Sequence, residues 1–229
     1  MEDASRSDNG EVTGFLNQTV TMVGEERRYV LYKPWEYDPG ESWPFIAFLH
    51  GAGERGSDGL KPSDVGIGKA IRNYANRFPA LVAMPQCPAE SWWDKAFGVV
   101  DAVMEAVLTS YPIDEDRVYL TGLSMGGYGT WWYGAKHPER FAALLPICGG
   151  GQPEDAEELA KTPIWAVHGE DDSVVSPSES RRMVEAVREA GGNVKYTELT
   201  DTGHDSWDPA YSDPDIVQWL FKQKRNRRS

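Results

Sequence analysis

Residues 118–136 read VYLTGLSMGGYGTWWYGAK, and this stretch decides the fold. Its first part is apolar and rich in β-branched and aromatic residues, which predicts a buried strand, and its second part has a helical pattern. Between them lies the pattern Gly-x-Ser-x-Gly, in which Gly122 and Gly126 make room for a sharp turn around Ser124. Such a turn exposes a serine hydroxyl at the carboxyl end of a strand and the amino end of a helix. Ser124 is therefore the predicted nucleophile, and the backbone N–H of Met125 should face any oxyanion that forms there.

Short apolar runs alternate with helical patterns on both sides of this stretch. The expected strands lie at residues 19–23, 28–33, 45–50, 81–84, 118–123, 141–147, 164–168 and 194–199, and the expected helices at 68–78, 97–111, 125–136, 177–190 and from 214 onward. This alternation predicts an α/β fold with a mostly parallel open sheet and helices on both faces. Such sheets bind ligands at the carboxyl ends of their strands, so the residues that follow each apolar run are candidates for a site.

A serine hydroxyl is a weak nucleophile and needs a neighbouring base. His204 follows the last predicted strand in a loop that can reach Ser124, so it is the predicted base. Asp171 and Asp172 both follow the strand at 164–168 and can orient the imidazole; Asp172 is the first choice and Asp171 the alternative. The other histidines of this sequence lie at the ends of predicted strands or helices: His50, His137 and His168.

A second oxyanion donor is expected in the segment HGAGERG at residues 50–56, which directly follows the strand at 45–50. Small residues leave the backbone N–H groups of this segment free to approach a substrate oxygen. The amide of Ala52 or that of Gly53 is expected to act together with the amide of Met125.

Four segments together resemble the α/β-hydrolase superfamily, and more narrowly its small carboxylesterases, the phospholipase/carboxylesterase, esterase-D-like and feruloyl-esterase or polyester-depolymerase-like group. They are HGAGERG at 50–56, DEDRVYLTGLSMGGYGTW at 114–131, HGEDDSVV at 168–175 and GHDSW at 203–207. The resemblance implies a triad of Ser124, Asp172 and His204, with Met125 and a residue of the HGAG turn as oxyanion donors. A dienelactone hydrolase would carry cysteine in place of Ser124, so that relative is disfavoured.

The sheet order of this superfamily also bears on the two cysteines. It places the strand at 81–84 outside the strand at 45–50, and the strand at 141–147 beyond the strand at 118–123. Cys87 and Cys148 would then lie three strand spacings apart, on the order of 14 Å, which is too far for a disulfide. Two free thiols are expected.

Length and charge narrow the possible partners. The chain has 229 residues, predicted to form a single catalytic domain over 1–229 with flexible termini at about 1–14 and 224–229. Its net charge of −13 disfavours nucleic acids as partners. No apolar stretch is long enough for a membrane span, no metal-ligand spacing is evident, and no cofactor is expected. The amino-terminal segment lacks the pattern of a signal peptide, which favours the cytoplasm if Met1 is the native start. The oligomeric state has no signal in the sequence.

The expected substrate is a small-molecule or polymer-attached ester. Residues 148–163 are too few for a large cap domain, so the site should be open. Three of the nine tryptophans, Trp92, Trp93 and Trp207, follow predicted strands on the side of the triad and are predicted to bind substrate as aromatic walls. The favoured function is hydrolysis of short-chain or aryl carboxylic esters through an acyl-enzyme, including ester groups on polysaccharides or polymers. The alternatives are a serine peptidase of the prolyl-oligopeptidase type and a non-enzymatic binding scaffold.

Overall fold

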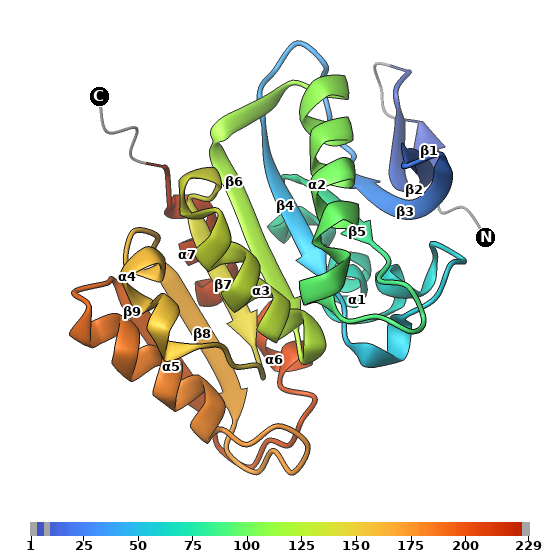
Figure 1. The fold of residues 1–229 in the computed structure, drawn as a ribbon. Coiled ribbons are helices and arrows are strands. Elements are labelled where there is room, and N and C mark those ends of the chain that lie inside the picture. Colours follow the sequence, from blue (N-terminus) through green and yellow to red (C-terminus); the bar gives the residue numbers. More distant parts are fainter. Residues whose placement is uncertain (1–3, 7–9, 226–229) are drawn as a thin grey trace.

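The computed structural model describes residues 4–6 and 10–225, and its strands form one twisted sheet (Figure 1). Within these residues, nine strands pair in the order β1-β2-β3-β5-β4-β6-β7-β8-β9. The strands are β1 (Ala4–Arg6), β2 (Val12–Met22), β3 (Glu25–Lys33), β4 (Trp43–Leu49), β5 (Leu81–Pro85), β6 (Ile113–Leu123), β7 (Ala143–Ile147), β8 (Ile164–Gly169) and β9 (Val194–Leu199).

The strands from β5 to β9 in this order run parallel, whereas β1, β2 and β3 join the edge at β5 in antiparallel fashion. The prediction of a mostly parallel sheet is confirmed, as is the position of β5 outside β4 and of β7 beyond β6. The carboxyl ends of the parallel strands lie along the lower edge of the sheet in Figure 1. The loops that follow these strands therefore meet at one edge.

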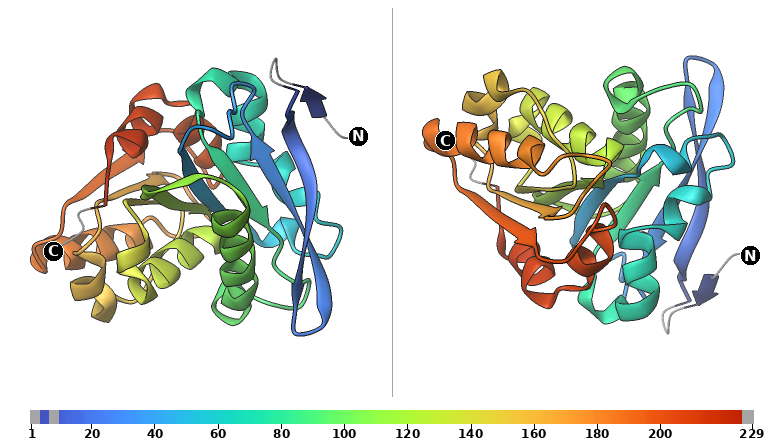
Figure 2. Two further views of the ribbon diagram at one scale, coloured as in Figure 1. Left: turned by 90° about the horizontal axis from the view of Figure 1, so that it is seen from above. Right: turned by 90° about the horizontal axis from the view of Figure 1, so that it is seen from below.

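Helices cover both faces of the sheet, as the sequence predicts (Figure 2). One face carries α2 (Trp93–Ser110), α3 (Met125–Lys136), α4 (Ala156–Leu159) and α5 (Ser178–Glu189), and the other carries α1 (Ile67–Tyr74), α6 (Trp207–Ser212) and α7 (Pro214–Lys222). Short 3₁₀ helices lie at Ala52–Glu54, Lys61–Asp64, Ala75–Arg77, Pro138–Arg140 and Pro153–Asp155.

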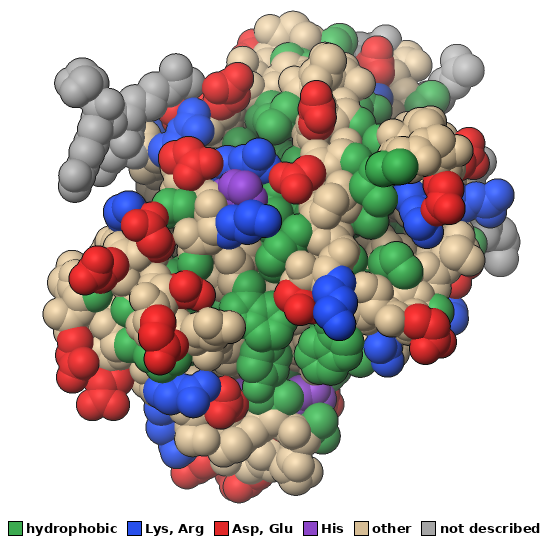
Figure 3. Space-filling model, in the orientation of Figure 1, with side chains coloured by type: hydrophobic (Ala, Val, Ile, Leu, Met, Phe, Trp, Pro, Cys, Tyr) green, Lys and Arg blue, Asp and Glu red, His purple; other side chains and the backbone are tan. Residues whose placement is uncertain are grey.

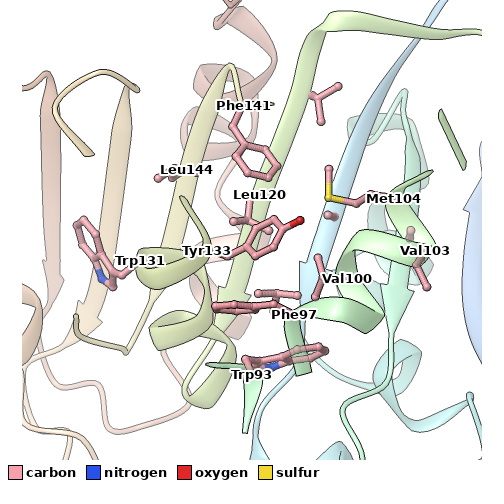
Figure 4. Close-up of a cluster of buried hydrophobic side chains, with 14 of the residues drawn as sticks. Trp93, Phe97, Val100, Val103, Met104, Leu120, Trp131, Tyr133, Phe141 and Leu144 are labelled. Atoms are coloured by element: carbon pink, nitrogen blue, oxygen red, sulfur yellow. The ribbon is translucent and has the colours of Figure 1, made fainter. Parts of the chain in front are cut away.

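Two hydrophobic cores, one on each face, follow from the alternation of side chains along the strands. In β4, Phe45 and Leu49 join the core under α2 and α3, while Ile46 and Phe48 join the core under α1, α6 and α7. Figure 4 shows the first of these cores, in which aromatic side chains of α2 and α3 pack against β6 and β7. The central strands are covered on both faces, so the nucleophile turn rests on a rigid base.

The flexibility expected of residues 1–14 and 224–229 stays a prediction, and the structure describes backbone hydrogen bonds in part of each segment. Residues 4–6 pair with β2, which itself begins at Val12, so most of the described part of the first 14 residues is in strands. At the other end, the backbone N–H of Arg225 donates to the Asp116 carbonyl at 2.8 Å. Residues 1–3, 7–9 and 226–229 lie outside the described part of the chain.

The segment at 148–163 agrees with the expectation of no large cap domain. It holds one 3₁₀ turn and the four-residue helix α4, which contacts α3 and α5. The sequence missed α6, which begins at Trp207, and placed the start of α2 four residues too late. No helix in the described residues has the length and apolar character needed to span a bilayer.

Candidate active site

The nucleophile turn joins β6 to α3 at the lower edge of the sheet. Ser124 sits at the turn with φ 53° and ψ −117°, a backbone conformation that is rare for a residue with a side chain. A Cβ atom on Gly122 would lie 2.3 Å from the Gly126 carbonyl oxygen, and one on Gly126 would lie 1.9 Å from that of Leu49. The two glycines are therefore required because strand, turn and helix approach one another too closely for any side chain.

The structure brings Ser124, His204 and Asp172 into one chain of hydrogen bonds. The Nε2 atom of His204 lies 2.9 Å from the Oγ atom of Ser124, and its Nδ1 atom lies 2.7 Å from the Oδ2 atom of Asp172. Because a carboxylate only accepts, Nδ1 carries the proton and Nε2 is free to accept the serine hydroxyl. Asp171 is exposed and points its backbone N–H at the Thr202 carbonyl, so Asp172 is the carboxylate of this chain.

Asp172 is ionised although its side chain is fully buried. Burial opposes the charge, but the hydrogen bond from His204 and those from the backbone N–H groups of Val175 and Val174 outweigh it and lower the pKa of Asp172. Both amides donate to the Oδ1 atom at 2.9 Å. The ionised carboxylate can therefore accept the hydrogen bond from the Nδ1–H of His204.

A second backbone turn lies against the nucleophile. After β4 the chain forms a 3₁₀ turn at Ala52–Glu54, and a Cβ atom on Gly51 would lie 3.7 Å from that of Ser124. The N–H groups that begin such a turn point outward from it without a partner in the turn. Gly51, which begins the turn that contains Ala52 and Gly53, therefore adjoins Ser124, and Met125 directly follows Ser124 as the first residue of α3.

His50 fixes the direction of this turn. Its Nε2 atom accepts the backbone N–H of Cys87 at 2.9 Å, so Nδ1 carries the proton and donates to the Gly51 carbonyl at 2.6 Å. Burial lowers the pKa of His50 to about 4, so the ring is neutral at pH 7. In a trans peptide the N–H points opposite to the C=O, so holding the Gly51 carbonyl also sets the direction of the Ala52 N–H.

The three tryptophans predicted as walls of the site have different surroundings. Trp207 packs its ring edge-on against His204, with 5.3 Å between the ring centroids. Trp92 is 46% exposed at the start of α2. Trp93 is fully buried, donates its Nε1–H to the His50 carbonyl at 3.0 Å and belongs to the core in Figure 4.

The prediction that Trp93 lines the site is therefore wrong. Successive residues at the start of a helix point about 100° apart, so one residue of a Trp-Trp pair faces solvent when the other faces the core. Trp93 supports the site indirectly because it packs on His50, with 5.0 Å between the ring centroids.

Two residues near the triad were not singled out for it from the sequence. Cys148 directly follows β7, and its Sγ atom accepts the backbone N–H of Ser124 at 3.3 Å. His168, in β8, lies with its Nε2 atom 3.1 Å from the Oδ2 atom of Asp172. Both residues follow the rule that strand carboxyl ends meet at one edge, and that rule is the signal that could have pointed to them.

Both cysteines are buried free thiols, as predicted. Burial raises the pKa of Cys87 to about 11 and that of Cys148 to about 12, so both remain protonated at neutral pH. In the described part of the chain, one group of side chains has the spacing of metal ligands, namely Cys148, Asp172 and His204. The Asp172 and His204 atoms of this group already bond to each other.

The site is open to solvent. The side chain of His204 is 20% exposed, Ser124 is partly exposed, and Val174, next to the loop that holds Asp172, is 70% exposed. In Figure 3 hydrophobic side chains gather toward the lower centre of the face, beside a histidine, whereas acidic side chains are spread over the rest.

Comparison with known proteins agrees with this geometry. A thermostable esterase of known structure superposes with a TM-score of 0.84 and 34% sequence identity, covering 97% of this chain and 70% of that one. A bifunctional acetylxylan esterase/xylanase of Neocallimastix patriciarum is 32% identical over 77 residues, which are 34% of this chain and 12% of that protein. A poly(3-hydroxyoctanoate) depolymerase of Pseudomonas fluorescens is 26% identical over 143 residues, 54% of this chain. The chain spans about half the length of the depolymerase, 51%, and less of the bifunctional enzyme.

The family comparison corrects one expectation. Residues 82–206 match the dienelactone hydrolase family, although Ser124 had disfavoured that relative. The matched residues include Ser124, Asp172 and His204. With its parallel sheet, its helices on both faces and its Ser, Asp, His order, the chain belongs to the dienelactone hydrolase family of the α/β-hydrolase superfamily.

Proposed function

We propose that the protein is a serine-dependent carboxylic-ester hydrolase that works through an acyl-enzyme. The observation that carries this proposal is the unbroken chain of hydrogen bonds from Ser124 through His204 to Asp172. An activated serine beside free backbone N–H groups is the arrangement that acyl transfer requires.

In the first half of the reaction, Ser124 Oγ attacks the ester carbonyl carbon while His204 Nε2 takes its proton. Asp172 stabilises the imidazolium that results. The carbonyl oxygen becomes an oxyanion, which accepts the backbone N–H of Met125 and that of Ala52. We assign Ala52 rather than Gly53 because His50 sets the direction of the Ala52 amide. His204 then gives its proton to the departing alcohol.

In the second half, water enters the site that the alcohol has left. His204 takes a proton from the water, the resulting hydroxide attacks the acyl carbonyl, and the same two amides hold the second oxyanion. Collapse of this intermediate releases the carboxylic acid, and the proton on His204 returns to Ser124.

We propose short-chain or aryl esters as substrates, including acetyl or feruloyl groups attached to polysaccharides and other polymer esters. The partly exposed His204 leaves access for a bulky group, and two exposed apolar side chains, Trp92 and Val174, lie on loops that follow strands at the same edge of the sheet. The net charge of −13 favours neutral substrates over polyanions. An esterase of related structure and relatives named as an acetylxylan esterase and a polyester depolymerase support this class.

Replacing the nucleophile tests the mechanism. Ser124→Ala should lower kcat for p-nitrophenyl acetate by about 10⁶-fold, because an intact base and acid cannot act without the nucleophile. Circular dichroism and the thermal midpoint should stay close to those of the wild type. Turnover equal to that of the wild type in a folded Ser124→Ala variant would disprove the mechanism.

A substrate panel then tests the class. It should contain p-nitrophenyl esters of increasing chain length, methyl ferulate, acetylated xylan and a peptide anilide. The largest kcat/KM is expected on the short-chain or aryl esters. A preference for the anilide would instead show a peptidase, and absence of turnover on every substrate would favour a binding scaffold.

A further inference from the structure

A second imidazole touches the carboxylate of the triad, at the same oxygen atom that faces His204. His168 is the second-last residue of β8 and is fully buried. Its Nε2 atom lies 3.1 Å from the Oδ2 atom of Asp172 and 2.9 Å from the Val175 carbonyl oxygen. Its Nδ1 atom lies 2.8 Å from the Oγ atom of Ser180 in α5.

These contacts determine where the His168 proton lies. Both atoms next to Nε2, a carboxylate oxygen and a carbonyl oxygen, only accept hydrogen bonds, so Nε2 must carry a proton. Burial lowers the pKa of His168, so the ring is neutral at pH 7 and carries its one proton on Nε2. The Nδ1 atom and the Gly149 carbonyl oxygen each lie 2.8 Å from the Ser180 hydroxyl, which has a single proton to donate. His168 is therefore a neutral donor that points at Asp172.

The carboxylate of Asp172 is consequently held at both oxygen atoms. Oδ1 accepts the backbone N–H groups of Val174 and Val175, and Oδ2 accepts the N–H of His204 and the N–H of His168. Of the two imidazoles, His204 lies on a partly exposed loop and must exchange its proton during the reaction, whereas His168 is fixed in the central sheet.

We propose that His168 is a positioning residue of the triad, which holds the Oδ2 atom of Asp172 toward His204 throughout the reaction. One chain of hydrogen bonds then connects four residues: Ser124, His204, Asp172 and His168. This proposal rests on the proposed function, since it concerns how fast Ser124 is activated. His168 itself does not contact the substrate.

Three substitutions separate this role from simple packing. His168→Gln places an amide N–H where Nε2 stands and keeps the donor. His168→Asn places its amide near Nδ1, so it keeps a polar group toward Ser180 but cannot reach Asp172. His168→Leu removes the donor at similar volume. His137→Leu is the matched control, because His137 lies at the far end of α3, away from the triad.

We expect His168→Leu and His168→Asn to lower kcat for p-nitrophenyl acetate by about 10- to 100-fold, the effect of losing one hydrogen bond to a buried charge. KM should change less than twofold, and the downfield proton resonance of the Asp172–His204 hydrogen bond should broaden or vanish. His168→Gln should stay within about threefold of the wild type, and His137→Leu should be unchanged.

Two results would overturn the positioning role of His168. A wild-type kcat in His168→Asn or His168→Leu would overturn it, as would an equal loss in His168→Gln, which would show a packing role. Should His168→Leu fail to fold, the comparison of Asn with Gln still decides the question. Labelling of Ser124 by a fluorophosphonate, measured on the wild type, tests the proposed function separately: a wild type that neither labels nor turns over esters refutes that function, whatever the His168 variants do.

Discussion

Two parallel strands of the sheet lead into the same dipeptide at the same edge. β4 is followed by His50-Gly51, and β8 ends in His168-Gly169. Both imidazoles are fully buried, and burial lowers the pKa of both, so both are neutral at pH 7. The sequence assigns neither imidazole a role of its own.

The two rings nevertheless carry their proton on opposite nitrogen atoms. His50 accepts at Nε2 from the Cys87 N–H and donates from Nδ1 to the Gly51 carbonyl, whereas His168 donates from Nε2 toward Asp172. His50 thereby orients the turn that would bind the oxyanion, and His168 orients the carboxylate that stabilises the imidazolium. The difference teaches that the groups facing each ring, and not the shared His-Gly dipeptide, decide the tautomer and with it the role.

The largest effect is expected from Asp172→Asn, which replaces the carboxylate that His168 contacts. An amide donor facing His204 Nδ1 reverses the tautomer of that ring, so that Nε2 can no longer accept the Ser124 proton. We expect kcat to fall by about 10⁴-fold, with folding retained. The same change at the exposed neighbour, Asp171→Asn, should leave kcat within about twofold. If Asp171→Asn were the more damaging change, Asp171 would be the acid instead.

The role of His50 in orienting the turn at Gly51 and Ala52 is tested by replacing its ring. His50→Leu frees the Gly51 carbonyl and with it the Ala52 N–H, so we expect kcat to fall by roughly 100-fold, at the lower end of the loss of an oxyanion donor. His50→Asn keeps a donor near the position of Nδ1 and should recover most of the rate. The rates of both variants on p-nitrophenyl acetate, with thermal midpoints as a folding check, test this role. An Asn variant as slow as the Leu variant would argue against it.

The next effect is on the free energy of unfolding, which depends on the protonation of the buried rings of His50 and His168. His50 has a pKa of about 4 in the folded protein against 6.5 as its ordinary value, so between these values the unfolded chain binds more protons. Stability should therefore fall as the pH drops from 6.5 to 4, by about 3 kcal/mol from His50. His168 acts in the same direction, and Glu54, whose pKa burial raises, acts in the opposite one.

Asp172 does not contribute to this change, because its pKa is lowered in the folded protein and its stabilisation is lost only below about pH 4. Urea unfolding at pH 7, 5.5 and 4 measures the effect, and His50→Asn should flatten the dependence. A free energy of unfolding that is equal at pH 7 and pH 4 in the wild type would contradict the assignment of neutral buried rings.

The smallest effect concerns the cysteines, one beside each part of the site. The Cys87 backbone holds His50, and the Cys148 thiol lies under Ser124. Because both thiols are buried and protonated, a disulfide reagent such as DTNB should react slowly with the folded protein and with two thiols per chain after unfolding. Rapid reaction of one thiol in the native state, or a change of mass on reduction, would show that a cysteine is exposed or paired.

Much of the fold was predictable because its signals are local. The bounds of α3 and β9 agree with the prediction residue by residue, and the Gly-x-Ser-x-Gly turn lies where strand and helix meet. The amino-terminal strands were only partly predicted, because pairing along a sheet edge orders polar residues that have no hydrophobic pattern. The assignment of Trp93 failed because a Trp-Trp pair does not reveal which ring faces the core.

The sequence by itself determined the parallel sheet, the Gly-x-Ser-x-Gly turn with Ser124, and the pairing of Ser124 with His204, since each depends on a short motif at the end of a strand. Only the tertiary structure decided between Asp171 and Asp172, placed Trp93 in the core, and gave the two His-Gly dipeptides different roles. The physical reason is that the direction of a hydrogen bond depends on which donor or acceptor faces the ring. For His50 that partner is the backbone N–H of Cys87, which comes from a distant part of the chain, and for His168 it is the Asp172 carboxylate in the loop after β8.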